Sequence, residues 1–450
     1  MINRTLNDFL IRWKTSSNRL PLILRGARQV GKTTLINEFS KNYDQYLYFN
    51  LEKTEDAKLF SNFPTLSSLV QLLFLSKNLT YESQKSTLIF IDEVQEYPAV
   101  IEQLRYFHED FPSLHIIVSG SLLDFALTKI EKVPVGRVEY AELHPLSFRE
   151  YLQASNKWAI IERLDKDLPL SNTFSPLIFA IFNEYAMIGG MPMIVNNYLE
   201  EKSLVRTKEL LNAITEAYKT DVSKYAKNQN EAKIIRQIID VVPFLVDERI
   251  NMANFGNLNF KSKEIKNGLV LLQQARLLEL VYPTTQTQPP IINDFAKRPR
   301  LHFLDIGLLN FQLGLHQAYL TVSDLNHLAK GSLVQQIVNQ EIKAQSYLST
   351  PNKSFWARDE KGTSSELDII YPFQNLLIPI EVKSGATGTL RSLHEFMDRC
   401  NHDFAVRIYG GELKIDEIFT RKGKKYKLLN LPYFLSGWLD QYLDWFLKGA

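Results

Sequence analysis

A glycine-flanked segment near the start of the chain has the residue types that bind phosphate. It fits the pattern G-x-x-x-x-G-K-[ST], and its residues are Gly26, Ala27, Arg28, Gln29, Val30, Gly31, Lys32, Thr33 and, directly after the pattern, Thr34. Glycines let backbone N–H groups wrap around phosphate oxygens, and a helix that follows adds its partial positive charge. We therefore predict a nucleotide site in which Lys32 reaches the β and γ phosphates and Thr33 binds Mg²⁺.

Two carboxylates at the end of an apolar run supply the second half of such a site. Residues 88–91 are Leu-Ile-Phe-Ile, and Asp92 and Glu93 follow them directly. The run predicts a buried strand that carries both carboxylates at its end. Asp92 is then placed to hold Mg²⁺, directly or through water, and Glu93 to orient and activate the attacking water. A solvated acidic turn is the alternative, which the upstream phosphate loop makes the weaker one.

Ser119 and Arg137 are further candidates, each with a structural alternative. Ser119 opens the segment Ser-Gly-Ser after a strand-like run, where a hydroxyl could sense the γ-phosphate or position the lytic water. Equally, Ser121 could cap the helix that follows. Arg137 could stabilise charge in the transition state of phosphoryl transfer, whereas its spacing alone favours a surface arginine. Arg28, inside the loop, has the same two interpretations.

A third group of charged residues lies in the C-terminal part of the chain. Asp368 precedes a predicted hairpin turn, and Glu381 and Lys383 follow it on one face of the next strand, because strand side chains alternate. Asp368 and Glu381 could bind Mg²⁺ or Mn²⁺, and Lys383 could stabilise charge or assist the attacking water. Metal-assisted cleavage of a phosphodiester needs such a set. A hairpin with solvated charges is the alternative, and the pattern leaves the two about equal.

The elements that position these residues indicate an α/β chain. With 450 residues it exceeds one ordinary domain. Short apolar runs alternate with amphipathic helices up to about residue 152, which predicts a parallel sheet with crossover helices. The predicted strands are residues 21–24, 46–51, 87–91 and 115–118.

The remaining elements fall into a helical middle and a second α/β part. Residues 154–225 are mostly helical with a turn at 189–192, and two further helices precede a strand at 277–282, which resembles a winged helix. The C-terminal part alternates strands with helices. The predicted strands there are residues 354–357, 367–371, 376–382 and 404–408.

Composition excludes several classes of protein. With 52 basic and 50 acidic residues the net charge is +2, which excludes a protein that coats nucleic acid through bulk charge but leaves local basic sites open. The single cysteine, Cys400, excludes an intramolecular disulfide and argues against a cysteine-based zinc site. No apolar run approaches the roughly 18 residues of a spanning helix. We therefore expect a cytoplasmic protein with no membrane partner.

The motifs, taken in order, resemble those of a known family. The phosphate loop is followed by Asp92-Glu93-Val94-Gln95, then by Ser119, Arg137 and the segment Leu-His-Pro-Leu-Ser-Phe-Arg-Glu at residues 143–150. Gly-Gly-Met-Pro at residues 189–192 and Leu-Asp-Ile-Gly-Leu-Leu at residues 304–309 complete the set. This order resembles the prokaryotic AAA-superfamily ATPases that carry an uncharacterised nuclease-like C-terminal domain, and the resemblance covers nearly the whole chain.

The resemblance implies a fold class and roles for individual residues. It implies a P-loop NTPase parallel sheet at residues 1–153, a helical subdomain at 154–228, a winged-helix-like domain at 229–295 and a restriction-endonuclease-like α/β domain at 296–450. It further implies Ser119 as a sensor and Arg137 as an arginine finger, acting within its own chain or on a neighbour. One departure counts against cleavage: where the family usually has a glutamate in the helix before Asp368, this chain has Gln335, a weaker ligand for a hard cation.

Three hypotheses about function follow. The leading one is an ATPase that binds ATP and Mg²⁺ and couples hydrolysis to movement of the C-terminal nuclease-like module. The second is an ATP-gated, metal-dependent DNA nuclease. The third is a nucleotide-switched DNA-binding or adaptor protein without nuclease activity, with DNA held by the winged-helix-like or C-terminal module. A homo-oligomer is a further expectation.

Overall fold

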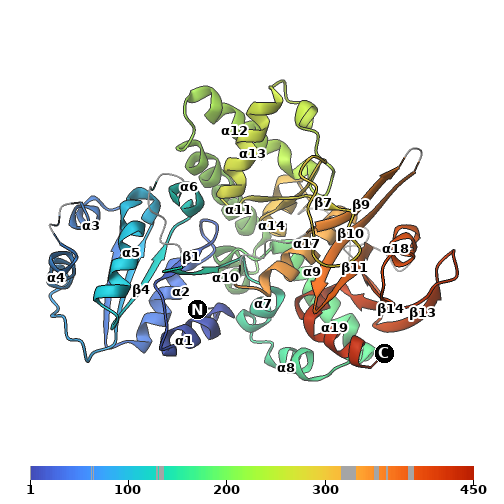
Figure 1. The fold of residues 1–450 in the computed structure, drawn as a ribbon, viewed down its shortest axis with the longest axis horizontal. Helices are drawn as coiled ribbons and strands as arrows, with labels where there is room; N and C mark the ends of the chain where they lie inside the picture. Colours follow the sequence, from blue (N-terminus) through green and yellow to red (C-terminus); the bar gives the residue numbers. More distant parts are fainter. Residues whose placement is uncertain are drawn as a thin grey trace.

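The computed structural model of the chain describes residues 2–61, 63, 65–127, 130, 136–315, 331–348, 354–360, 363–383 and 390–449. Figure 1 shows three parts in sequence order: an N-terminal sheet with its helices, a group of helices that projects above the rest, and a C-terminal sheet on the other side. Mixed α/β architecture was predicted and is confirmed.

The N-terminal sheet has five parallel strands in the order β2-β3-β4-β1-β5. The strands are β1 (Leu22–Arg25), β2 (Gln45–Asn50), β3 (Thr87–Asp92), β4 (Leu114–Ser119) and β5 (Glu139–Glu142). The first four were predicted, because each is a buried apolar run or alternates buried and partly exposed residues. The edge strand β5 reads Glu-Tyr-Ala-Glu and was missed, because two glutamates leave no apolar run.

Helices cover both faces of this sheet, and each face has its own apolar core. The helices are α1 (Leu6–Thr15), α2 (Lys32–Phe39), α3 (Thr54–Leu59), α4 (Leu66–Ser76), α5 (Ala99–Asp110) and α6 (Leu123–Leu127). Helix α1 packs through Leu6, Leu10 and Trp13, the spacing that predicted it.

The middle of the chain is helical, as expected, up to a short antiparallel pair of strands. Its helices are α7 (Phe148–Ala154), α8 (Trp158–Lys166), α9 (Ser175–Ile188), α10 (Pro192–Glu201), α11 (Leu204–Ser223), α12 (Gln229–Val241) and α13 (Ser262–Gln274). Helix α13 approaches α12 closely at Gly268, where a Cβ atom would lie 2.5 Å from Ile238 Cδ1. Strand β6 (Leu278–Val281) then pairs with β8 (Arg300–Phe303), which lies beyond the boundary expected at residue 295.

The C-terminal part is built on a seven-stranded sheet in the order β13-β14-β12-β11-β10-β9-β7. The strand β7 (Pro283–Thr284) comes from the connection between β6 and β8, so the middle of the chain contributes an edge to this sheet. The other strands are β9 (Ser354–Glu360), β10 (Thr363–Phe373), β11 (Leu376–Lys383), β12 (Phe404–Tyr409), β13 (Lys414–Phe419) and β14 (Lys425–Pro432). Its helices are α14 (Ile306–Gln312), α17 (Gly331–Ala344), α18 (Arg391–Met397) and α19 (Leu439–Lys448).

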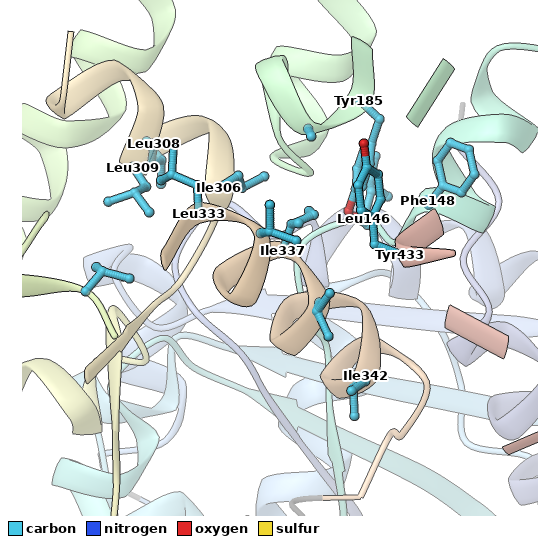
Figure 2. Packing of buried hydrophobic residues seen from close by; sticks show 14 of the residues in the cluster. Leu146, Phe148, Tyr185, Ile306, Leu308, Leu309, Leu333, Ile337, Ile342 and Tyr433 are labelled. Carbon is cyan, nitrogen blue, oxygen red and sulfur yellow. Dashed lines mark hydrogen bonds between the residues drawn. The ribbon is translucent and has the colours of Figure 1, made fainter. Parts of the chain in front are cut away.

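One large apolar core joins the helical middle to the C-terminal part. It contains Phe148 and Tyr185 from the middle, Leu309 from α14, and Leu333 and Ile337 from α17. Figure 2 shows α17 lying between these side chains. The cores of the N-terminal sheet form separate clusters. The apolar packing therefore joins the middle to the C-terminal part more strongly than either to the N-terminal sheet, while the predicted boundaries at residues 228 and 295 stay predictions.

Among the described residues, no single helix has the length and apolar character to cross a membrane, although the bent pair Asn172–Ile188 and Pro192–Glu201 meets both criteria when taken together.

Candidate nucleotide site

The phosphate loop connects β1 to α2, the context that the pattern requires. Its backbone has positive φ at Gly26 (148°), Gln29 (64°) and Gly31 (96°). At Gly26 a Cβ atom would also lie 2.4 Å from Leu143 O, so that only glycine fits. The Lys32 ammonium donates to Gly26 O at 2.9 Å and Ala27 O at 3.0 Å, and it is buried. Burial lowers the pKa of Lys32, while Glu93 and Asp92 oppose that shift.

Asp92, the last residue of β3, accepts hydrogen bonds from two hydroxyls, one in the first turn of α2 and one at the end of β4. Its Oδ2 accepts a hydrogen bond from Thr33 Oγ1 at 2.6 Å, and its Oδ1 accepts one from Ser119 Oγ. Asp92 and Ser119 end β3 and β4, and the loop before Thr33 follows β1; these strands are neighbours in the sheet. Because the strands are parallel, their carboxyl ends lie at the same end of the sheet. The Thr33 hydroxyl and the Asp92 carboxylate are hard oxygen donors, so the residues present fit Mg²⁺. The structure thus brings together Lys32, Thr33, Asp92 and Ser119.

Glu93 begins the turn after β3 and is held by a residue that the sequence analysis gave no role. Its φ is 54°, and its Oε2 accepts from Gln95 Nε2 at 2.6 Å. A Cβ atom at position 120 would lie 2.3 Å from Gln95 Oε1, so Gly120 makes the room that Gln95 occupies. Burial raises the pKa of Glu93, although Lys32 opposes the shift. The signal for Gln95 was its position two residues after Glu93.

A cavity of about 660 Å³ lies beside the loop. Lys32, Thr33 and Glu93 line one part of it, the N-terminal residues 2–4 another, and α10 a third. Buried Arg4 fixes the N-terminal part: it donates to Val30 O at 2.8 Å and His144 O at 2.6 Å, and pairs with Glu150 at 3.0 Å. The sequence did not predict that Arg4 and α10 lie at the nucleotide site. Both are separated from the motif in sequence and come next to it only in the folded chain.

Arg28 connects the phosphate loop to helix α11. Its guanidinium pairs with Asp221 of α11 and, at 3.5 Å, with Glu52. The Tyr218 hydroxyl, also on α11, donates to Arg28 O at 2.6 Å. The structure thus shows Arg28 in an ion pair with the helical middle, which neither interpretation of this residue included, and this contact links the loop to the helices of the large core.

Arg137 lies away from the cavity. Strand β5 runs parallel to β1 with Glu139 beside Leu22, the first residue of β1, whereas the phosphate loop follows the other end of β1. Arg137 precedes β5, pairs with Glu109 at 3.6 Å and has half of its side chain exposed. The arrangement does not support an arginine finger that acts within its own chain, so only action on a neighbouring chain stays a prediction.

The C-terminal candidates lie together on β10 and β11, the hairpin that the sequence predicted. Asp368 Oδ2 accepts from Val382 N at 2.8 Å, and Lys383 Nζ pairs with Glu381 Oε1 at 2.5 Å. The structure adds Arg300 from β8, which pairs with Asp368 at 3.3 Å. Burial and Asp368 raise the pKa of Glu381 to about 7.

The helix α17 carries Gln335 and Glu341, and both are buried. Glu341 is bonded to the helical middle of the chain, since it accepts from Phe148 N at 3.0 Å and from the Tyr185 hydroxyl at 2.7 Å. Glu341 therefore does not take the place of the family's glutamate, which is Gln335 in this chain. This agrees with the expectation from the sequence, where Glu341 lies more than one helical turn after Gln335.

Comparison with known proteins divides the chain into three stretches. Residues 18–152 match the model of a family described as an AAA domain. Residues 180–319 and 330–431 match two further families, each described as a domain of unknown function. An uncharacterised protein of Haemophilus influenzae is 23% identical over 251 residues, which are 52% of this chain and 54% of that protein. The chain thus spans about half the length of the curated relative that it matches.

Three solved structures share part of the architecture, none with a TM-score of 0.5. A Walker-type ATPase of Pyrococcus abyssi is 12% identical, with a TM-score of 0.45 over 70% of this chain and 96% of that one. The RuvB Holliday junction branch migration motor of Thermotoga maritima is 15% identical, with a TM-score of 0.30 over 66% and 93%. The Orc1 protein of Aeropyrum pernix, solved in complex with DNA, is 12% identical, with a TM-score of 0.28 over 70% and 92%. Residues 18–152 thus match the model of an AAA domain and contain the five-stranded parallel sheet with its phosphate loop.

Proposed function

We propose that the protein is an ATPase that binds ATP with Mg²⁺ at the phosphate loop. The observation that carries the proposal is the Thr33–Asp92–Ser119 cluster beside Lys32 and Glu93 at one cavity. Backbone N–H groups of residues 26–34 and the Lys32 ammonium bind the phosphates. Thr33 and Asp92 hold Mg²⁺, which supplies positive charge next to the phosphate oxygens. Glu93, positioned by Gln95, accepts the proton of the attacking water.

Contacts from the cavity to α17 support coupling of hydrolysis to movement of the C-terminal part. Helix α10 lines the cavity, and the turn before it donates from Gly190 N to Asp305 Oδ2 at 2.7 Å. The same oxygen accepts from Gln340 Nε2 of α17 at 3.3 Å. Since the middle and the C-terminal part share one apolar core, we propose that they move together against the N-terminal sheet.

The test is Glu93→Gln, which keeps the size of the side chain and removes the base. We expect the ATP turnover rate to fall about 100- to 10,000-fold while bound ATP remains on the protein. Steady-state phosphate release and the nucleotide content of the purified complex measure both. Glu381→Gln is the matched control, a buried glutamate in the C-terminal part whose substitution should leave turnover unchanged. Full turnover in Glu93→Gln would refute the role of Glu93.

A second function, nucleic-acid binding, is favoured by the outer face of α13. Lys261 at the helix start and Lys263 and Lys266 within it are exposed on this face with Asn267 and Gln273. None of the three lysines forms an ion pair with a described residue. Figure 1 places α12 and α13 in the group of helices that projects above the rest of the molecule. Lysine contacts phosphates, and asparagine and glutamine read bases in the major groove. The α12–α13 pair followed by β6 and β8 supports the winged-helix interpretation.

Charge reversal on α13 tests this second function. We expect Lys263→Glu with Lys266→Glu to lower the affinity for duplex DNA at least about 10-fold and to reduce the salt dependence of binding by nearly one unit per lysine. Fluorescence anisotropy over a salt series measures both. Lys208→Glu, an exposed lysine on α11, is the matched control. Equal affinities for the two variants would exclude α13 as the binding face.

A further inference from the structure

A buried cluster of charges joins the middle of the chain to the carboxylates of the C-terminal hairpin. Arg300 is its centre, with a tenth of its side chain exposed. Its Nη2 donates to Glu366 Oε2 at 2.7 Å, and its Nη1 lies 3.3 Å from both Asp247 Oδ1 and Asp368 Oδ1. One guanidinium thus contacts three carboxylates, of which two lie on β10 and one in the middle of the chain, and Arg249 pairs in addition with Glu366 at 3.0 Å.

The backbone holds Arg300 rigidly in this position. Strand β8 pairs with β6, and the residues on both sides of Arg300 are held as well: Asp247 N donates to Leu301 O at 2.8 Å, and Ile250 N donates to Pro299 O at 2.9 Å. The guanidinium carbon also lies 4.7 Å from the centre of the Phe355 ring, a cation–π distance. A long side chain held at its backbone and at its end loses little further freedom when it pairs.

Both carboxylates that the nuclease hypothesis assigns to the metal ion already pair with a cationic side chain. Asp368 uses Oδ1 for Arg300 and Oδ2 for Val382 N, and Glu381 uses Oε1 for Lys383. Glu381 Oε2 is buried without a hydrogen-bond partner, as is Gln335 Nε2 on α17. Among the described residues, no group of three or more His, Cys, Asp or Glu is arranged to hold a metal ion. Mg²⁺ and Mn²⁺ are bound by one or two carboxylates together with several waters, and they compete for those carboxylates with any cation already paired to them. The residues present therefore do not fit the divalent ion that the nuclease hypothesis requires.

We propose that Arg300 is the resident cation of the C-terminal site and takes the place of a divalent metal ion. A guanidinium compensates the carboxylates with directed hydrogen bonds and cannot lose its charge. The amide at Gln335 agrees with this role. Where Arg300 compensates the charge of the carboxylates, no third carboxylate is needed to bind a metal ion. The hairpin carboxylates then join β8 to the C-terminal sheet and do not catalyse cleavage of a phosphodiester.

Mn²⁺ binding to the full-length protein tests this proposal. The titrations use calorimetry and the electron paramagnetic resonance signal of Mn²⁺, without nucleotide and in an Asp92→Asn background, which removes the carboxylate at the phosphate loop. With Arg300 present we expect no Mn²⁺ site that depends on Asp368. Arg300→Ala should create one, with at least about 10-fold tighter binding, and adding Asp368→Asn should remove it again.

Two further results decide the proposal if Arg300→Ala folds poorly. Arg300→Lys keeps a cation in place and should bind no more Mn²⁺ than the parent. The parent alone is also decisive, since an Asp368-dependent Mn²⁺ site in the presence of Arg300 would overturn the proposal. A folded Arg300→Ala variant that gains no Mn²⁺ site would overturn it as well.

Discussion

The nucleotide site and the C-terminal site are built from the same residue types and differ in what faces the aspartate. At the phosphate loop, Asp92 is bonded by the hydroxyls of Thr33 and Ser119 and by Glu93 N at 3.0 Å, beside a cavity of about 660 Å³. At the hairpin, Asp368 is bonded by Arg300 and by a backbone N–H. A hydroxyl leaves the negative charge of the carboxylate available to a cation, whereas a guanidinium neutralises it. An aspartate, a glutamate and a lysine close together therefore indicate a catalytic site only when no arginine is paired with the aspartate.

The largest expected effect is on the free energy of unfolding after Arg300→Ala. Asp247 and Asp368 would lose their ion pair with Arg300, while Glu366 would keep the one with Arg249 at 3.0 Å, and breaking a buried charge network of this kind costs about 3–5 kcal/mol. Urea unfolding followed by circular dichroism measures the change. The matched variant in the other site is Arg28→Ala, whose side chain is 30% exposed, for which we expect about 1 kcal/mol or less. Equal losses for the two variants would show that the two sites do not differ in this way.

The next effect concerns the two lysines. Lys32→Ala removes the ammonium that we propose binds phosphate, and we expect the affinity for ATP to fall about 100-fold or more, since two charge-assisted hydrogen bonds are lost. Lys383→Ala, in contrast, should leave ATP affinity unchanged, because Lys383 pairs with Glu381 in the C-terminal sheet. Equilibrium binding of a fluorescent ATP analogue tests both variants. A similar loss for both would contradict the separation of the sites.

A third carboxylate, Glu341, is bonded by neutral donors and should make stability depend on pH. Burial raises its pKa in the folded protein to about 7, above about 4.5 in the unfolded chain. The folded state therefore holds a proton that the unfolded state loses. The resulting stabilisation is complete below pH 4.5 and is lost as the pH rises to 7, at about 1 kcal/mol per pH unit.

Glu341→Gln isolates this effect, because it keeps an acceptor for Phe148 N and the Tyr185 hydroxyl but cannot titrate. The difference in unfolding free energy between wild type and variant should decline from pH 5 to pH 7 and then continue falling only slightly. Urea unfolding at each pH gives this difference. Glu209→Gln, an exposed residue on α11, should give a flat difference. A flat difference for Glu341→Gln would show that its folded pKa is not raised.

The sequence predicts those parts of the molecule whose determinants are local. The strands β1 to β4 were found because each is a short run dominated by apolar residues, whereas β5 and β8 carry charges and were missed. The phosphate loop and Asp92 were predicted because consecutive residues form the pattern that identifies each of them. Arg300 could not be found, because nothing near it in sequence indicates that β8 passes beside Asp368. Arg4 and α10 were missed for the same reason.

The smallest expected effect on isolated chains is that of Arg137→Ala. Arg137 lies just before β5, at the end of the strands opposite to the phosphate loop, and is half exposed. We therefore expect that it does not reach a nucleotide bound to its own chain. At low protein concentration we therefore expect the turnover of Arg137→Ala to stay within about 2-fold of wild type, well below the 1,000-fold or larger effect of an arginine finger.

Protein concentration separates the remaining roles of Arg137. If a neighbouring chain supplies Arg137, the turnover of wild type should rise with protein concentration as chains associate, and that of Arg137→Ala should not. Turnover assays paired with sedimentation velocity at the same concentrations test this. Arg105→Ala, another half-exposed partner of Glu109 on α5, is the control for the loss of the surface ion pair. A large loss of ATP turnover for Arg137→Ala in dilute, monomeric protein would show that Arg137 does reach the nucleotide site of its own chain. It would then have to leave the position beside Glu109 during the reaction.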